Sequence, residues 1–257
     1  MSNINIGTSG WSYKSWEKCF YPEDVPKSRH LEFYATQFST VEINATFYRL
    51  PSPNMVQGWK TKAAPGFIYA VKGSRFITHM KKLANLNGAL DKFFDRIEPM
   101  KRRIGAILWQ LPPILRKDLS RLDAFMRLLP RRYHHAIEFR HPSWVDEEVF
   151  HLLRNHRAAH VSLSSLAMPT NLTVTSDLVY IRFHGLEGGA AHDYTRDELK
   201  PWAAHIRRQA EAGKTVYAFF NNDANVRAPY NAQLLIEMVT NRARNEAPAA
   251  KLALTEK

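Results

Sequence analysis

Charged and polar residues stand at alternate positions near the ends of several apolar runs in this sequence. Successive side chains of a strand point to opposite sides, so TVEIN (40–44) places Glu42 opposite Val41 and Ile43. The same alternation assigns one polar set to a shared inner face: Glu42, Lys72, Gln110, Glu138, Arg140, Arg182 and His184. Carboxylates and histidine transfer protons, and arginine and lysine bind anions. This set therefore indicates acid–base chemistry on a negatively charged ligand.

Two roles are open for the carboxylates. Glu42 or Glu138 can act as a general acid or base if burial moves its pKa toward neutrality, with His184 as partner and Asn221 and Asp223 as orienting groups. Neighbouring cations would instead keep both carboxylates ionised, and the set would then be a lattice of buried ion pairs. We predict Glu42, Glu138 and His184 as catalytic residues and keep the lattice as the alternative.

The cations and amides of the set are predicted to bind the substrate. Arg140, Arg182 and Lys72 suit a phosphate or a carboxylate. Further predicted contacts come from strand ends and from the loops that follow them: Asn44, Arg75, Gln110, His141, Asn221, Trp11 and Tyr13. Lys72 could form a Schiff base if its amine were desolvated, but two adjacent carboxylates would raise its pKa. An ion pair with Glu42 or a contact with the anion is therefore favoured for Lys72.

A metal site is an alternative to this cofactor-free interpretation. Glu138, His184 and Asp223 stand at the ends of three apolar runs and could hold a divalent metal. Metal-dependent barrel isomerases and endonucleases supply a carboxylate from the sixth strand, where this chain has Ser162 and Ser164. Arg140 and Arg182 would also repel a cation. We therefore predict no cofactor as the first choice.

The runs that carry these residues number eight and alternate with stretches of helical spacing. The runs are 4–9, 40–44, 67–73, 104–110, 135–140, 160–164, 178–184 and 215–223. The predicted helices are 26–38, 54–63, 88–101, 118–129, 144–156, 195–212 and 231–242, with a short or irregular sixth crossover at 165–177. This order predicts an α/β fold, a (β/α)8 TIM-type barrel, whose active site lies at the C-terminal ends of the strands.

We predict one barrel domain over 1–244 and a C-terminal tail over 245–257. Of the 257 residues 45% are hydrophobic, which is enough for one large core. The sequence has no apolar run long enough to span a membrane and no signal-peptide pattern at its start. With Cys19 as the single cysteine, these features favour a cytoplasmic protein without a membrane partner.

The formal net charge of +12 indicates an anionic partner. Nucleic acid is possible but is not favoured, because many of the cations fall in the last turns of predicted helices. There they offset the helix dipole, at the end of the barrel opposite the expected site. A small anionic ligand is the preferred partner.

Several motifs occur together and in order along nearly the whole chain. They are GTSGWSY (7–13), FYP (20–22), FSTVEINATFYRLPS (38–52), AVKGSRFITHMKKL (70–83), LWQLPP (108–113), IEFRHPSW (137–144), YIRFHG (180–185) and FFNND (219–223). This combination resembles the YecE-like family, catalogued as domain of unknown function seventy-two. The resemblance implies a (β/α)8-type barrel and no established activity.

The residues therefore lead to one functional hypothesis and two alternatives. We expect an enzyme that acts on a small phosphorylated or carboxylated substrate by carboxylate and histidine acid–base chemistry. The first alternative is a metal-dependent nuclease or a DNA-repair-type phosphodiesterase. The second is a non-catalytic protein that binds a ligand in the same pocket.

Overall fold

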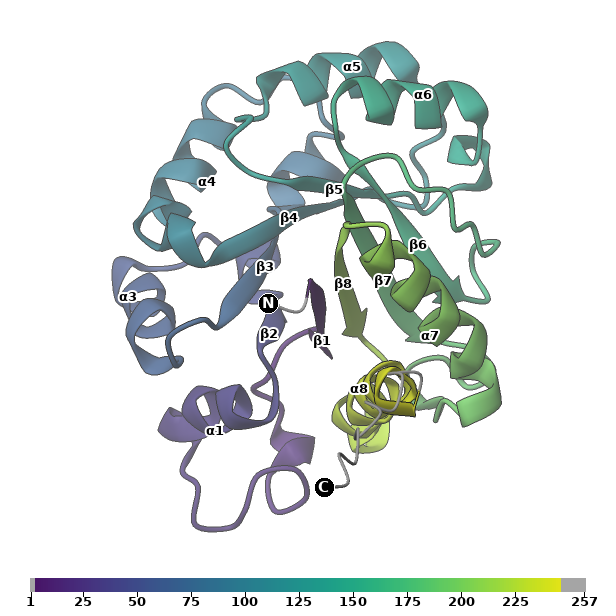
Figure 1. Cartoon of the computed structure of the whole chain (residues 1–257). Coiled ribbons are helices and arrows are strands. Elements are labelled where there is room, and N and C mark those ends of the chain that lie inside the picture. Colours follow the sequence, from purple (N-terminus) through teal and green to yellow (C-terminus); the bar gives the residue numbers. More distant parts are fainter. Residues whose placement is uncertain (1–2, 246–257) are drawn as a thin grey trace, which may run out of the picture.

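The apolar runs form parallel strands that curve into a barrel, and the helices cover its outside (Figure 1). The computed structural model describes residues 3–245. The strands are β1 (Ile4–Thr8), β2 (Thr40–Ile43), β3 (Ile68–Lys72), β4 (Ile104–Gln110), β5 (His135–Glu138), β6 (Ala159–Ser165), β7 (Leu178–Gly185) and β8 (Thr215–Phe220). The α-helices are α1 (His30–Gln37), α2 (Ala45–Tyr48), α3 (Pro53–Lys62), α4 (Ala89–Ile97), α5 (Leu119–Leu128), α6 (Glu147–Asn155), α7 (Arg196–Glu211) and α8 (Arg227–Asn245). The predicted (β/α)8 fold is confirmed.

The strand order is β1-β8-β7-β6-β5-β4-β3-β2, so the ring must close between β1 and β2. That seam has one isolated bridge, between Ser9 and Glu42, and the Gly10 amide donates to the Glu42 carbonyl at 2.8 Å. Lower down, the Tyr34 hydroxyl accepts from the Thr8 amide at 3.0 Å and donates to the Thr40 carbonyl at 3.2 Å. The barrel thus closes at the predicted site residue Glu42.

Two apolar layers hold the barrel together. Residues such as Val41, Ile43 and Ile181 pack between the strands and the helices. A second cluster, with Leu108 and Tyr180 among its members, fills the barrel interior. This division follows the alternation predicted from the sequence and leaves the polar set above the interior cluster.

Several helix boundaries follow local signals in the sequence. Ser52 accepts a hydrogen bond from the Met55 amide at the start of α3, and Asp118 accepts from the Arg121 amide at the start of α5. Gly213 has φ +79° just after α7, a conformation that favours glycine. These local signals account for the starts of α3 and α5 and for the end of α7.

The sixth crossover contains no helix between Ser165 and Leu178, a segment that the structure describes in full. The prediction of an irregular segment is therefore confirmed. On β6 the residues that join the interior cluster are Ala159, Val161 and Leu163, together with Met168 from the following loop. The barrel interior is thus apolar on its β6 side.

Of the predicted tail 245–257, Asn245 is the last residue of α8, and the remainder lies outside the described residues. Within the described part of the chain, none of the helices combines the length and the apolar character that crossing a membrane requires.

Candidate functional site

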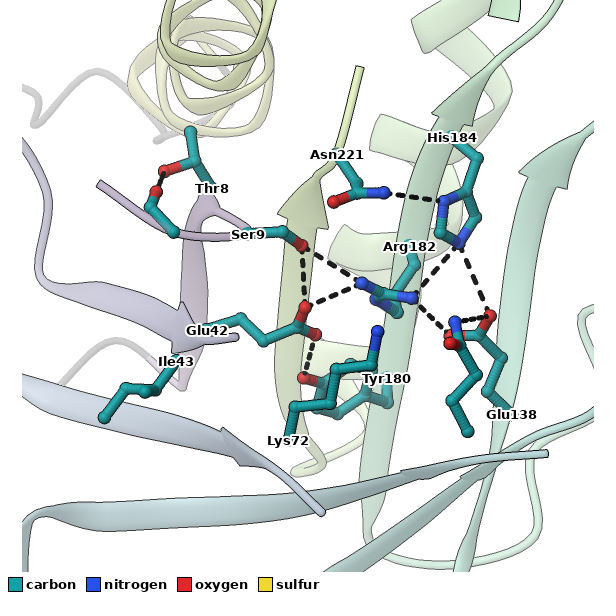
Figure 2. Close-up of polar contacts among 12 residues, drawn as sticks. Thr8, Ser9, Glu42, Ile43, Lys72, Glu138, Tyr180, Arg182, His184 and Asn221 are labelled. Atoms are coloured by element: carbon teal, nitrogen blue, oxygen red, sulfur yellow. Dashed lines mark hydrogen bonds and ion pairs between the residues drawn. The ribbon is translucent and has the colours of Figure 1, made fainter. Parts of the chain in front are cut away.

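Arg182 lies at the centre of the polar set, between the two predicted carboxylates (Figure 2). Its Nη2 donates to Glu42 Oε1 at 2.7 Å, and its Nη1 donates to Glu138 Oε2 at 2.6 Å. All three residues are fully buried. One guanidinium on β7 therefore ties the end of β2 to the end of β5 across the barrel.

Glu42 has further donors on both oxygens. The Ser9 hydroxyl donates to Oε1 and the Tyr180 hydroxyl donates to Oε2, each at 2.7 Å. Arg182 Nη2 also donates to the Ser9 hydroxyl at 3.3 Å. Because Ser9 follows β1, these bonds complete the seam between β1 and β2.

Glu138 is held in the same way from its other side. Gln110 Nε2 donates to Oε1 at 2.8 Å, and Arg140 Nε donates to the same oxygen. The Arg140 side chain is 21% exposed, so it lies at the open edge of the set. Glu138 thus connects the buried Arg182 with the more accessible Arg140.

These bonds decide the charge of the carboxylates. Burial raises the pKa of Glu42, but Arg182 and Lys72 outweigh burial and bring the pKa below its usual value. Burial likewise raises the pKa of Glu138, and Arg140 and Arg182 bring it well below the usual range. Both carboxylates are therefore ionised at neutral pH, as in the alternative of a buried ion-pair lattice.

His184 is neutral in this arrangement. Burial and the charge of Arg182 lower its pKa to about 4. Its Nε2 lies 2.9 Å from Arg140 Nη2, 3.2 Å from Arg182 Nη1 and 3.5 Å from Glu138 Oε1. On the other side of the ring, Asn221 Nδ2 lies 3.1 Å from Nδ1. His184 therefore positions the two guanidinium groups.

Lys72 differs from every other charged member of the set. The residue is 8% exposed, yet its Nζ forms no hydrogen bond and no ion pair with the described residues. The expected ion pair with Glu42 is thus not formed, because Arg182, Ser9 and Tyr180 occupy the carboxylate oxygens. Nζ lies instead 4.2 Å from the centroid of the Phe47 ring. Figure 2 shows the side chain directed from β3 toward Arg182.

The environment of Lys72 disfavours its charged form. Burial and the nearby charge of Arg182 lower its pKa to about 8, although Glu42 and Glu138 act in the opposite direction. The amine is therefore still mainly protonated at pH 7, with a substantial neutral fraction just above it. The two carboxylates thus raise the pKa of Lys72, as the sequence predicted, but burial and the charges of Arg182 and Arg140 outweigh them.

The rim around Lys72 is also basic. Burial and then the charges of Lys72, Arg75 and Arg140 lower the pKa of His79 to about 4. Arg75 is exposed and forms no bond or ion pair with the described residues. This rim carries positive charge without a matching carboxylate.

Other predicted contacts are placed less centrally. Trp11 packs edge-on against Trp59 of α3, with ring centroids 6.3 Å apart. The Tyr13 hydroxyl donates to the Ser9 carbonyl, which places it beside the seam. Asn44 directly precedes α2, and its side-chain oxygen is buried without a partner among the described residues.

His141 caps the short helical turn Pro142–Trp144, where its Nδ1 accepts from the Ser143 amide at 3.2 Å. Its side chain bonds to Ser143 and not to Glu138 or Arg182, so the expected contact of His141 with the substrate stays a prediction.

The three residues of the alternative metal site are not brought together. Among the described residues, no group of three or more His, Cys, Asp or Glu side chains is arranged to hold a metal ion. Asp223 instead accepts a hydrogen bond from the Trp16 indole, and burial raises its pKa to about 6. The guanidinium groups of Arg140 and Arg182 surround Nε2 of His184, the nitrogen that such a site would need.

Sequence reasoning missed Ser9, Tyr180, Phe47 and His79. Tyr180 lies two residues before Arg182 on β7 and therefore on the same face as Arg182 and His184. Extending the alternation toward the start of the strand would have predicted it. Ser9 follows β1 in the GTSG motif, but nothing marks its pairing with Glu42. Phe47 and His79 lie in α2 and in the π-helical turn Phe76–Met80, where strand periodicity gives no signal.

Comparisons with a family model and with known proteins agree on the family of this chain. A family model described as "Protein of unknown function DUF72" matches residues 5–253. The chain is 31% identical over 142 residues to the UPF0759 protein YecE of Escherichia coli (strain K12), which covers 55% of this chain and 50% of that protein. The chain thus spans about half the length of that relative. It is 22% identical to the UPF0759 protein YunF of Bacillus subtilis (strain 168), over 92% of this chain and 94% of that protein.

Solved structures agree with the fold. A DUF72 family protein from Thermotoga maritima aligns with a TM-score of 0.84 and 30% identity, over 92% of this chain and 98% of that chain. A DUF72 family protein from Enterococcus faecalis aligns with a TM-score of 0.80 and 18% identity, over 93% and 95% of the two chains.

Proposed function

We infer the function of this chain from its own residues, because the chain belongs to the DUF72 family, whose description assigns no function. The resemblance drawn from the sequence motifs is thereby confirmed. We propose that the protein is a barrel enzyme that acts on a small anionic substrate, phosphorylated or carboxylated, at the C-terminal ends of its strands.

Unbalanced positive charge at the barrel mouth carries this proposal. Glu42 and Glu138 are already bound to Arg182 and, for Glu138, to Arg140. Within residues 3–245, neither Lys72 nor Arg75 on the rim forms an ion pair with a carboxylate. A protonated Lys72 therefore leaves the set with more cations than carboxylates. In a partly desolvated site, an anionic group supplies the missing charge.

The proposed roles follow from which atoms are free. Arg140 uses Nε and Nη2 within the set, and its Nη1 forms no bond to the described residues, so it can donate to an anion at the open edge. Glu42, Glu138 and Arg182 form a rigid support, and His184 positions the guanidinium groups. Proton transfer by Glu42, Glu138 or His184 stays a prediction, and each has its lone pairs engaged. Lys72 is the group best placed to move a proton.

The remaining expectations are part of the same proposal. We expect a cytoplasmic location, with a small anionic ligand as the partner in preference to nucleic acid. The nuclease alternative depends on Glu138, His184 and Asp223, which the fold does not gather into one group. The alternative of non-catalytic ligand binding uses the same pocket and differs in predicting no chemical step.

Inorganic phosphate is the simplest probe of the pocket. We expect the Arg140→Gln variant to bind phosphate about tenfold to a hundredfold more weakly than the unchanged protein, since a hydrogen bond to a charged group contributes about 1.5–3 kcal/mol. Titration calorimetry at low salt measures this, after circular dichroism has shown that the variant is folded.

Arg196→Gln is the matched control, because Arg196 pairs with Glu237 on the exposed surface of α7 and α8. Its phosphate affinity should equal that of the unchanged protein. Equal affinity in the Arg140 variant, or no measurable binding of phosphate to the unchanged protein, would contradict the proposed anion pocket.

A further inference from the structure

The Lys72 amine is the one charged group of the polar set that has no hydrogen bond and no ion pair among the described residues. Each carboxylate near it accepts several hydrogen bonds from other donors, and the Phe47 ring packs against the amine. The residue ends β3, on the face of the barrel where the strands present their last side chains. A lysine that served only to balance charge would be paired with Glu42 or Glu138.

The surroundings of this amine favour a nucleophile. A lysine becomes nucleophilic when it is desolvated or lies next to another cation, because both lower the stability of the ammonium form. Here burial and Arg182 bring the pKa of Lys72 to about 8. About one amine in ten is then neutral at pH 7, compared with fewer than about one in a thousand for an ordinary lysine.

We propose that Lys72 forms a covalent imine with the carbonyl carbon of a small anionic substrate, either a 2-oxo acid or a phosphorylated aldehyde or ketone. This inference rests on the proposed function, because the anionic group of the substrate lies at Arg140 while its carbonyl faces Lys72. Beyond the proposed function, the inference specifies that the substrate reacts through a carbonyl group and that a C=N bond to Lys72 forms.

The step balances without an oxidant or a reductant. The lone pair of neutral Nζ attacks the carbonyl carbon, and the C=O π pair moves to the oxygen, which takes a proton from nitrogen to give a carbinolamine. The second hydrogen of the amine then leaves with that oxygen as water, and the C=N bond forms. Protonation of the imine by solvent makes it an electron sink for breaking an adjacent C–H or C–C bond, and hydrolysis returns the lysine.

Reductive trapping tests the proposal. The folded protein is incubated with pyruvate, glyoxylate or dihydroxyacetone phosphate in the presence of sodium cyanoborohydride, and the product is measured by intact mass and peptide mapping. We expect one adduct per chain, on Lys72, with at least one of the three probes. Its rate should rise about tenfold per pH unit below pH 8 and level off above it, as the neutral amine fraction does.

Two variants define the controls. Lys72→Arg keeps the positive charge and should lose the adduct, whereas Lys81→Met removes an exposed lysine of the neighbouring loop and should keep it. Absence of Lys72 labelling with all three probes, or labelling spread over exposed lysines with no preference for Lys72, overturns the proposal. If Arg140→Gln still weakens phosphate binding in that case, the imine fails and the anion pocket stands; if it does not, both fail.

Discussion

Replacing Arg182 by Met is expected to destabilise the protein by about 3–5 kcal/mol, because the change leaves two buried carboxylates without their main partner. Glu42 and Glu138 are fully buried and each receives a charged hydrogen bond from this guanidinium. The free energy of unfolding, measured by urea denaturation and followed by circular dichroism, gives the size of the loss. This loss is large compared with the about 5–15 kcal/mol by which a typical domain is stable.

The uncompensated negative charges of Glu42 and Glu138 should account for that loss of stability. Adding Glu42→Gln and Glu138→Gln to the Arg182→Met variant removes both uncompensated charges, so much of the lost stability should return. Arg196→Gln controls for loss of an arginine from an ion pair, since its partner Glu237 lies on the surface, and it should change stability little. An Arg182→Met protein as stable as the Arg196→Gln control would contradict the central position of Arg182.

The Glu138→Gln variant distinguishes a structural role of Glu138 in the ion pairs from a catalytic role. We expect it to lose about 3 kcal/mol of stability, because the neutral amide compensates neither Arg182 nor Arg140. The same urea experiment measures this. Glu237→Gln is the matched control, since it removes an exposed carboxylate from a paired arginine.

The comparison with Lys72→Met sharpens the result. That change removes a cation that has no ion pair with any residue of the described part of the chain, so it should cost far less stability than Glu138→Gln while abolishing imine trapping. A Glu138→Gln protein that keeps full stability but loses a measured activity would instead make Glu138 a catalytic acid or base, as the sequence suggested.

The sequence predicted the barrel and the membership of the polar set well, because both depend on strand periodicity. Glu42, Glu138, Arg182 and His184 lie together for the reason that predicted them, which is that the inward positions at the strand ends meet at one end of a barrel. The irregular crossover after β6 was also predictable from the lack of a helical period.

Pairing within the set could not be predicted, because it depends on distances across the barrel. Arg182 on β7 bonds to both carboxylates because Glu42 on β2 and Glu138 on β5 each lie within hydrogen-bond distance of its guanidinium group. Because Arg182 bonds to both carboxylates, the expected ion pair between Lys72 and Glu42 does not form. Phe47 enters from a short helix after β2, in a loop whose path strand periodicity does not determine.

The most direct test of this account is the ionisation of Lys72 itself. In protein labelled with ¹³C-lysine, the chemical shift of the Cε next to Nζ can be followed by NMR from pH 6 to pH 11 and assigned by its loss in Lys72→Arg. We predict a midpoint at a pKa of about 8, set by burial and by Arg182. A midpoint near 10.4, the ordinary value for lysine, would show that nearby negative charge offsets the effects of burial and Arg182 on the ammonium group. That result would contradict the proposed role of Lys72.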